Sequence, residues 1–310
     1  MKKIPVSLII DDGSPVNMFY FHNPGTPHEF IVPPAFTREF AKCVAKNGIK
    51  GKFSVVPNPG CLGSLDKKVN RVPAVNIKKF LDLVRTELQG PFSITPEILT
   101  HYRAINLETG NAMHVFEDVY ISKLCKEEIA DYVAHALEIL SNCGLHPTGV
   151  TSPWNTGIDN EKNYYEGIGR AFVKQLGRKK CFYFLHSNDE KWTLPTVMVD
   201  TAETGRVVHI PNNAKDPFWD TQNPATARQA VASARRQIDS LISPDGKKGK
   251  LIELADAGLP LIFISHWPSI FSDGRKIGLE GLNALAERIN KHFGNAIEWM
   301  NFEELAEMAK

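Results

Sequence analysis

Short apolar runs alternate with amphipathic stretches along almost the whole chain. The apolar runs end at turn-forming residues, as buried strands do: Asp11-Asp12-Gly13 follows the first, and Pro57-Asn58-Pro59-Gly60 follows the second. A later run contains Pro96, which must lie at a bulge or a strand end. The pattern predicts strands at residues 6–10, 52–56, 92–100, 149–151, 181–185, 259–265 and 297–300.

The amphipathic stretches carry apolar residues at helical spacing. In the first of them, Phe40 and Val44 lie on one stripe, which Asn47-Gly48 ends. Strands separated by helices indicate parallel βα units, hence a barrel or a doubly wound sheet, and the pattern alone does not choose between them. A barrel would carry its active site in the loops that follow the strands. The predicted helices cover residues 37–46, 75–88, 123–140, 160–176, 226–242 and 279–292.

Composition narrows the class of protein. The chain has 310 residues, 43% of them hydrophobic, which suits one large α/β domain or two ordinary ones. A formal net charge of +1 gives no general electrostatic reason to bind nucleic acid or an anionic membrane. The five cysteines are odd in number and form no Cys-x-x-Cys pair, which argues against a disulfide framework and a thiolate zinc site.

The N-terminal apolar run does not read as a membrane or secretion signal. It follows Met1-Lys2-Lys3, is short, and ends at two acidic residues, as a buried strand does. No segment approaches the ~20 apolar residues that span a bilayer. We therefore expect a soluble cytoplasmic protein with no membrane or nucleic-acid partner, and we leave a homo-oligomer open.

Residues able to do chemistry follow several predicted strands. Asp11 and Asp12 follow the first; they can form a simple strand stop, or one can hold a cation while the other acts as a general base. His101 ends the third strand, and a lone histidine there is more often structural. The stretch after it adds further groups that can bind zinc or a similar divalent ion, namely His114, Glu117 and Asp118.

Two loops combine aromatic residues with polar ones. Trp154 follows residues 149–151, and Trp267 follows His266 after the most apolar strand. Large aromatics are usually core residues, but in a polar loop an indole also offers a stacking surface for a sugar ring. His266 is a candidate general acid, with a histidine bonded to backbone in a packed loop as the alternative.

The order of these motifs resembles that of the polysaccharide deacetylases. Residues 7–13 resemble the family's opening motif, a strand running into Phe-Asp-Asp-Gly, and residues 48–55 look like its second strand. Pro153-Trp154 resembles the Pro-Trp of the third motif, and Ser265-His266 resembles the last. The resemblance covers nearly the whole chain. It implies one deformed (β/α) barrel domain over residues 1–310 and metal-dependent removal of acetyl groups from sugars.

The resemblance also implies roles for residues. Asp11 would be the general base, Asp12 a metal ligand, and His266 the acid that protonates the leaving group. The cofactor would be a divalent metal, with zinc as the expected ion. The residues that would contact the substrate are Pro153, Trp154 and Trp267.

The sequence departs from the family pattern at two places. The family's second motif has two histidines four residues apart, and no such pair exists here. Two registers remain open: His101 or His114 takes the first histidine position, and Asp118 takes the second in both. Thr151 stands where the family usually has an arginine that orients the base.

Our leading prediction is a metal-dependent hydrolase that removes an acetyl or similar acyl group from a sugar or small amide. Its partner would be a small carbohydrate or acylated substrate. One alternative is a catalytically altered homologue that binds carbohydrate without hydrolysis. The other is a barrel glycosidase that uses a carboxylate pair such as Asp11 and Glu117, with the two carboxyls ~5–10 Å apart.

Overall fold

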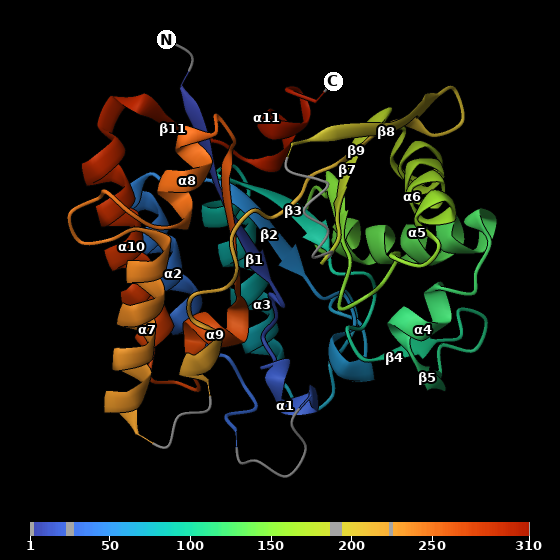
Figure 1. The fold of residues 1–310 in the computed structure, drawn as a ribbon. Coiled ribbons are helices and arrows are strands. Elements are labelled where there is room, and N and C mark those ends of the chain that lie inside the picture. The colour runs from blue at the N-terminus through green and yellow to red at the C-terminus, as the bar shows by residue number, and fades with distance from the viewer. Residues whose placement is uncertain (1–2, 23–27, 187–193, 223–225, 310) are drawn as a thin grey trace.

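The computed structural model describes residues 3–22, 28–186, 194–222 and 226–309. Strands and helices alternate as predicted (Figure 1). The strands are β1 (Ile4–Asp11), β2 (Gly51–Val55), β3 (Phe92–Pro96), β4 (Arg103–Ile105), β5 (Ala112–Phe116), β6 (Gly149–Thr151), β7 (Lys180–Phe184), β8 (Thr196–Thr201), β9 (Gly205–His209), β10 (Leu261–His266) and β11 (Ile297–Trp299). The helices are α1 (Phe19–His22), α2 (Pro34–Asn47), α3 (Ala74–Leu83), α4 (Glu117–Ile121), α5 (Lys126–Asn142), α6 (Glu161–Leu176), α7 (Ala227–Leu241), α8 (Lys250–Asp256), α9 (Trp267–Phe271), α10 (Ile277–Phe293) and α11 (Phe302–Ala306).

Two sheets carry the site. In the first, parallel strands run in the order β10-β1-β2-β3, and β11 pairs with the start of β1. In the second, the order is β6-β7-β9-β8, and β8 is antiparallel to β9. The predicted mixed α/β organisation with parallel strands is therefore confirmed.

Isolated bridges join the two sheets at two places. On one side Ile94 pairs with Pro147 and Glu97 with Thr151, which joins β3 to the segment around β6. On the other side Ala214, in the segment after β9, pairs with Phe263 of β10. A ring of strands results, but no continuous ladder closes it as a barrel within the described ranges.

Alternation along β1 divides the core into two parts. Val6, Leu8 and Ile10 belong to the large core that the surrounding helices cover, whereas Ile9 packs in a second cluster inside the ring. Phe302, from α11, also belongs to the inner cluster. Residues i and i+2 of a strand face the same way, so Asp11 faces inward with Ile9.

Helices cover the outside of the ring. Figure 1 shows α2, α7 and α10 on one side and α5 and α6 on the other. Local signals set several of their ends: α2 stops at Gly48, whose φ of 65° is left-handed, and α7 starts at a capping box between Thr226 and Gln229. No helix within the described ranges is long and apolar enough to cross a membrane.

Some elements were not predicted. Residues 103–121 form the β4–β5 hairpin and the short helix α4, and residues 196–209 form the antiparallel pair of β8 and β9. These elements are short, and some are little buried; β5, for example, alternates exposed and half-buried positions. Such segments lack the long apolar run on which the strand predictions relied.

Candidate functional site

The site begins where β1 ends. Parallel pairing places Asp11 opposite His266 of β10. Asp12 then adopts a left-handed φ of 66°, which a short polar side chain tolerates, and the two neighbouring carboxylates lie among different partners. Gly13 is required sterically, because a Cβ there would lie 2.0 Å from the carbonyl oxygen of Ser54.

Asp12, Glu97 and His101 form the first group, named the Asp12 cluster here. Nε2 of His101 lies 2.9 Å from Asp12 Oδ1 and 3.2 Å from Glu97 Oε1. The three potential ligand atoms all lie within 4.8 Å of one another, and all three residues are buried. Burial alone would lower the pKa of His101, but the two carboxylates raise it well above its usual value.

Neighbouring groups fix the orientation of this cluster. Oε2 of Glu97 accepts hydrogen bonds from the hydroxyl of Ser54, at 2.6 Å, and from the backbone N–H of Asp12. On the other side, Nδ1 of His101 lies 3.1 Å from Nε2 of His22, in helix α1. With the proton on Nδ1 of His101, His22 accepts it and Nε2 of His101 is left free to bind a cation.

The loop that carries His101 is strained and is held by a buried acid. Ile98 and His101 have positive φ values of 26° and 50°. The carboxylate of Glu117 accepts hydrogen bonds from the backbone N–H groups of Leu99, Thr100 and His101, and from the hydroxyl of Tyr132. Burial raises the pKa of Glu117 to about 7, although these hydrogen bonds lower it in part. Glu117 therefore supports the backbone of the site.

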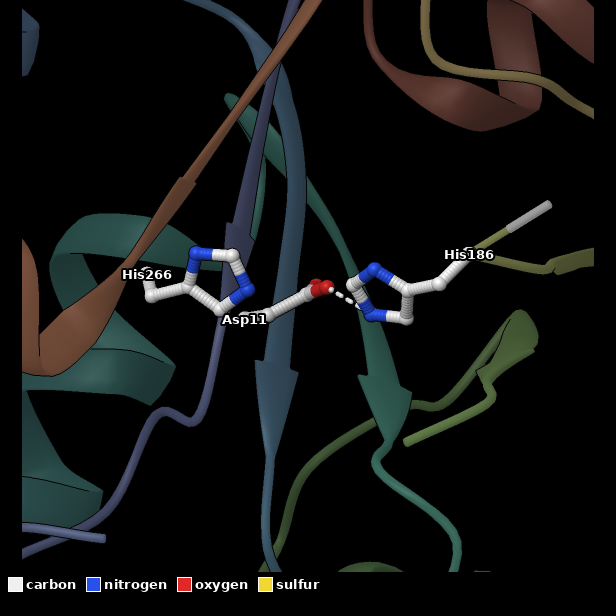
Figure 2. A group of neighbouring side chains, drawn as sticks. All are labelled: Asp11, His186 and His266. Atoms are coloured by element: carbon white, nitrogen blue, oxygen red, sulfur yellow. Dashed lines mark ion pairs between the residues drawn. The ribbon is translucent and has the colours of Figure 1, made fainter. Parts of the chain in front are cut away.

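Asp11, His186 and His266 form the second group, named the Asp11 cluster here. Figure 2 shows the Asp11 carboxylate between the two imidazole rings, and His186 Nε2 lies 3.0 Å from Asp11 Oδ2. The rings of His186 and His266 are stacked, with centroids 5.8 Å apart. The side chains of His186 and His266 are 23% and 17% exposed, so this cluster reaches solvent.

A buried lysine is the charge partner of Asp11. Lys52 lies on β2, and its ammonium donates hydrogen bonds to Asp11 Oδ1 and, at 2.6 Å, to Thr151 Oγ1. Lys52 and Asp11 are both fully buried. Burial alone would raise the pKa of Asp11, but Lys52 and then His186 lower it to about 2. Asp11 is therefore an ionised carboxylate at neutral pH.

A second acid orients His266. Nδ1 of His266 lies 2.9 Å from Oδ2 of Asp216, which also accepts a hydrogen bond from the hydroxyl of Ser269 at 2.6 Å. Burial alone would lower the pKa of His266, but the hydrogen bond to Asp216 and the nearby charges of Asp12, Asp216 and Asp11 raise it to about 9. His266 therefore holds a proton at neutral pH, with Nε2 on the side away from Asp216.

Aromatic rings border both clusters. Trp154 is half-buried, has a left-handed φ of 49°, and its ring lies 4.7 Å from that of His101. The exposed ring of Phe116 lies beyond it. Next to the Asp11 cluster, Trp219 is 45% exposed, and its ring lies 4.8 Å from that of His266.

The Asp12 cluster has the donor set of a divalent cation site. Asp12 Oδ1 and Glu97 Oε1 are buried and accept no regular hydrogen bond in the described part of the chain. One imidazole nitrogen cannot donate a straight hydrogen bond to both oxygens. Two buried carboxylates side by side are costly unless a positive charge lies between them, and that charge is either the proton on His101 or a cation that replaces this proton. The residues present therefore fit a bound divalent ion.

Comparison with known proteins places the fold. No family model and no curated protein matches the sequence. The crystal structure of Puue allantoinase is similar over 98% of this chain and 89% of that one, with 11% identity and a TM-score of 0.52. At this identity the likeness shows a shared fold only.

Two further solved structures are similar with lower TM-scores. BA3943 from Bacillus anthracis, described as a CE4 family pseudoenzyme, has 11% identity, a TM-score of 0.44, and coverage of 100% of this chain and 67% of that one. A lactam utilization protein from Thermus thermophilus has 11% identity, a TM-score of 0.41, and coverage of 96% and 100%. Because both TM-scores are below 0.5, neither likeness indicates a function for this chain.

The structure groups four of the residues singled out in the sequence, namely Asp11, Asp12, His101 and His266. It places His114 and Asp118 elsewhere. His114 is exposed on strand β5, and Asp118 lies in the first turn of α4, where its carboxylate accepts a hydrogen bond from the N–H of Val119. Neither belongs to the possible metal groups of the described residues.

Trp267 was expected to contact the substrate, but it lies in the core. Trp267 is fully buried, packs against Phe36, Phe40 and Phe53, and donates a hydrogen bond to the carbonyl oxygen of Ser14. It is a core residue with no surface for a substrate, because it begins α9 under the helical layer. Pro153 is buried as well. Trp154 remains beside the site, and Trp219 stands where Trp267 was expected.

Several site residues were not predicted from the sequence. Glu97 lies four residues before His101, which is the spacing of the absent histidine pair. This spacing would have identified Glu97 if a glutamate had been accepted in place of one of the two histidines. His186 follows a predicted strand, as His101 and His266 do. Lys52 and Asp216 had no comparable signal, because their partners are 41 and 50 residues away in the chain.

Proposed function

We propose that this protein is a metal-dependent hydrolase that removes an acetyl or similar acyl group from a sugar or a small amide. The observation that carries the proposal is the pairing of a cation site at Asp12 with an ionised carboxylate and a protonated imidazole at Asp11 and His266. When bound at the Asp12 cluster, a divalent ion would polarise the acyl carbonyl and lower the pKa of water.

Asp11 is the proposed base. Its carboxylate is charged at neutral pH, is fixed through Oδ1 by Lys52, and has Oδ2 3.0 Å from His186. A fixed, ionised carboxylate next to a cation site can accept the proton of the attacking water.

His266 is the proposed acid. Asp216 accepts the hydrogen bond of Nδ1, so the proton on Nε2 is the one available to the leaving amine or alkoxide. The carboxylate of Asp216 also stabilises the charged imidazolium until that proton is transferred.

Aromatic rings favour a substrate that contains a sugar ring. Trp154 and Trp219 border the two clusters from different loops, and an indole face packs well on the apolar face of a pyranose. The carbohydrate part of the proposal rests on these two rings and on the resemblance of the sequence to polysaccharide deacetylases.

Two gaps in the family pattern have structural counterparts here. Glu97 occupies the cation site together with His101, and Lys52 binds both Asp11 and Thr151, the residue that stands where an arginine was expected. These contacts favour a hydrolase over a homologue that only binds carbohydrate. They also disfavour a glycosidase that uses Asp11 and Glu117, because the oxygens of Glu117 are bonded to backbone N–H groups and Tyr132.

Metal analysis of two neighbouring variants tests the proposal. We expect about one divalent ion per chain in wild type purified without added metal or chelator, and none in Asp12→Ala. Asp11→Asn is the matched control: it should keep the ion but lower the rate of p-nitrophenyl acetate hydrolysis by about 10²- to 10⁴-fold. Full activity in Asp12→Ala, or in chelated wild type, would refute the mechanism.

A substrate pair tests the carbohydrate part. Trp219→Ala should raise KM for an acetylated sugar by about 2- to 12-fold, the effect of losing about 0.5–1.5 kcal/mol of aromatic contact. It should leave KM for p-nitrophenyl acetate, which has no sugar ring, unchanged. Equal changes for both substrates would argue against a sugar bound at Trp219.

A further inference from the structure

We propose that Glu97 shifts the ion preference of the Asp12 cluster away from Zn²⁺ and toward hard divalent ions that prefer oxygen ligands, with Mn²⁺ as their representative. The inference rests on the proposed function only in requiring a cation at Asp12. The juxtaposition that carries it is the oxygen pair Asp12 Oδ1 and Glu97 Oε1 around the single nitrogen His101 Nε2.

Glu97 presents one fixed oxygen to the site. The side chain of Glu97 is fully buried, and its Oε2 is occupied by the Ser54 hydroxyl and the Asp12 N–H. Oε1 is buried without a regular hydrogen bond and points to the nitrogen that also faces Asp12. A purely structural glutamate would be expected to have both oxygens satisfied.

The donor count sets the ion class. Two carboxylates and a neutral imidazole give the site a formal charge of −2, whereas one carboxylate and two imidazoles would give −1. Carboxylate oxygens suit Mg²⁺ and Mn²⁺, while imidazole nitrogens suit Zn²⁺ and the later transition metals. Replacing a nitrogen donor by an oxygen donor therefore narrows the advantage that Zn²⁺ has over Mn²⁺ at most sites.

The surrounding contacts keep the number of imidazole ligands in the Asp12 cluster at one. His22 stacks on His101, but its Nε2 faces Nδ1 and the carbonyl oxygen of His101, at 3.1 and 3.2 Å. His22 is thus engaged in orienting the existing imidazole and does not supply a second nitrogen ligand. The other histidines beside the two clusters, His186 and His266, face Asp11 and Asp216.

Competitive titration of chelator-treated protein with Mn²⁺ and Zn²⁺ tests the proposal. Zn²⁺ is expected to bind more tightly in absolute terms, as it does at most such sites, so the informative quantity is the ratio of the two affinities. In Glu97→His that ratio should shift toward Zn²⁺ by at least about tenfold relative to wild type. Glu97→Gln, which keeps the oxygen and the shape, should weaken both ions with a much smaller change in the ratio.

The outcomes separate this inference from the proposed function. If wild type and Glu97→His bind both ions with the same ratio, the inference is overturned and the hydrolase proposal stands. If wild type binds neither ion, both fall. Because Glu97→His also loses the bond to Ser54 and can fail to fold, pulsed EPR of Mn²⁺ on wild type gives a second reading. One coupled imidazole nitrogen, lost in His101→Ala, is expected, and two would overturn the inference.

Discussion

Asp11 and Asp12 are neighbours in the sequence and both are buried, yet the charged groups around them differ. Asp12 shares its space with a second carboxylate, Glu97, and one imidazole. Asp11 meets an ammonium, Lys52, and lies between two imidazoles (Figure 2). One peptide unit therefore separates a carboxylate that shares a single imidazole with a second acid from a carboxylate that meets an ammonium and two imidazoles.

The difference assigns different chemistry to two identical side chains. A carboxylate pair without enough positive charge attracts a cation, while a carboxylate already neutralised by lysine is available for proton transfer. The inward-facing position of Asp11 and the left-handed φ of Asp12 produce this separation. It can be tested by perturbing each side alone.

The largest expected effect is on cation affinity, from His101→Ala. The variant removes one of the three ligand atoms of the Asp12 cluster, so affinity for Mn²⁺ or Zn²⁺ should fall by more than about 100-fold, as losses from outer-shell contacts alone reach 10- to 100-fold. Isothermal titration of chelator-treated protein measures it.

His114→Ala is the matched control for that loss. His114 was the competing candidate in the sequence, and it lies on β5, outside both clusters. Its removal should leave affinity within about twofold of wild type, as expected of a position that binds no ion. The reverse order of the two variants would mean that the cation lies elsewhere.

The next effect is on stability, from Lys52→Met. Removing the ammonium leaves Asp11 buried without its main charge partner, which typically costs about 3–5 kcal/mol in the free energy of unfolding. Urea unfolding at pH 7 measures it. Lys46→Met is the control, because Lys46 pairs with Glu287 on the surface and should contribute at most about 1 kcal/mol. Equal losses in both variants would contradict the role of Lys52.

Lys52→Met should also change how the stability of the protein depends on pH in acid. The pKa of Asp11 is lowered to about 2 from 3.8, so its stabilising contribution is present above about pH 4 and is lost as the pH falls toward 2. Without Lys52, the largest of the causes that lower this pKa is gone, and burial raises it. The acid decline in stability should then begin at a higher pH in Lys52→Met than in wild type.

The fold was largely predictable because its signals are local. Apolar runs that end in turns and helices that end at glycine are properties of short segments, and strands such as β1, β2, β6 and β10 were expected within a few residues of their observed ends. The ring closure was not predictable in detail, since it depends on isolated pairs such as Glu97 with Thr151, 54 residues apart by their numbers.

The candidate site was predictable in part, for the same reason. Asp11, Asp12 and His266 stand at strand ends, and His101 lies in the loop that follows β3, where parallel topology gathers side chains. Lys52 lies inside a strand and looks like an ordinary polar residue until β2 is paired with β1. The positions of Trp267 and Trp219 could not be predicted either. Which of the two indoles is buried depends on how α9 packs, and no local spacing in the sequence indicates this.

The smallest expected effect is a shift in pH dependence, from Asp216→Asn. The pKa of His266 is raised to about 9, so its acid form is present below that pH and is lost as the pH rises through it. Asparagine removes the charge that opposes burial, and the pKa of His266 should fall. The basic limb of kcat/KM for p-nitrophenyl acetate should therefore move down by about one pH unit or more.

Asp220→Asn serves as the control for this shift, because Asp220 lies in the same segment but accepts a hydrogen bond from the hydroxyl of Ser233 instead of contacting His266 Nδ1. Its profile should match that of wild type. NMR titration of the His266 ring in both variants separates an effect on the imidazole from an effect on the Asp12 side. If the basic limb stays in place while the ring pKa falls, His266 is not the acid. The proton for the leaving group would then have to come from the Asp12 cluster. The roles proposed for Asp11 and Asp12 would in that case have to be reassigned.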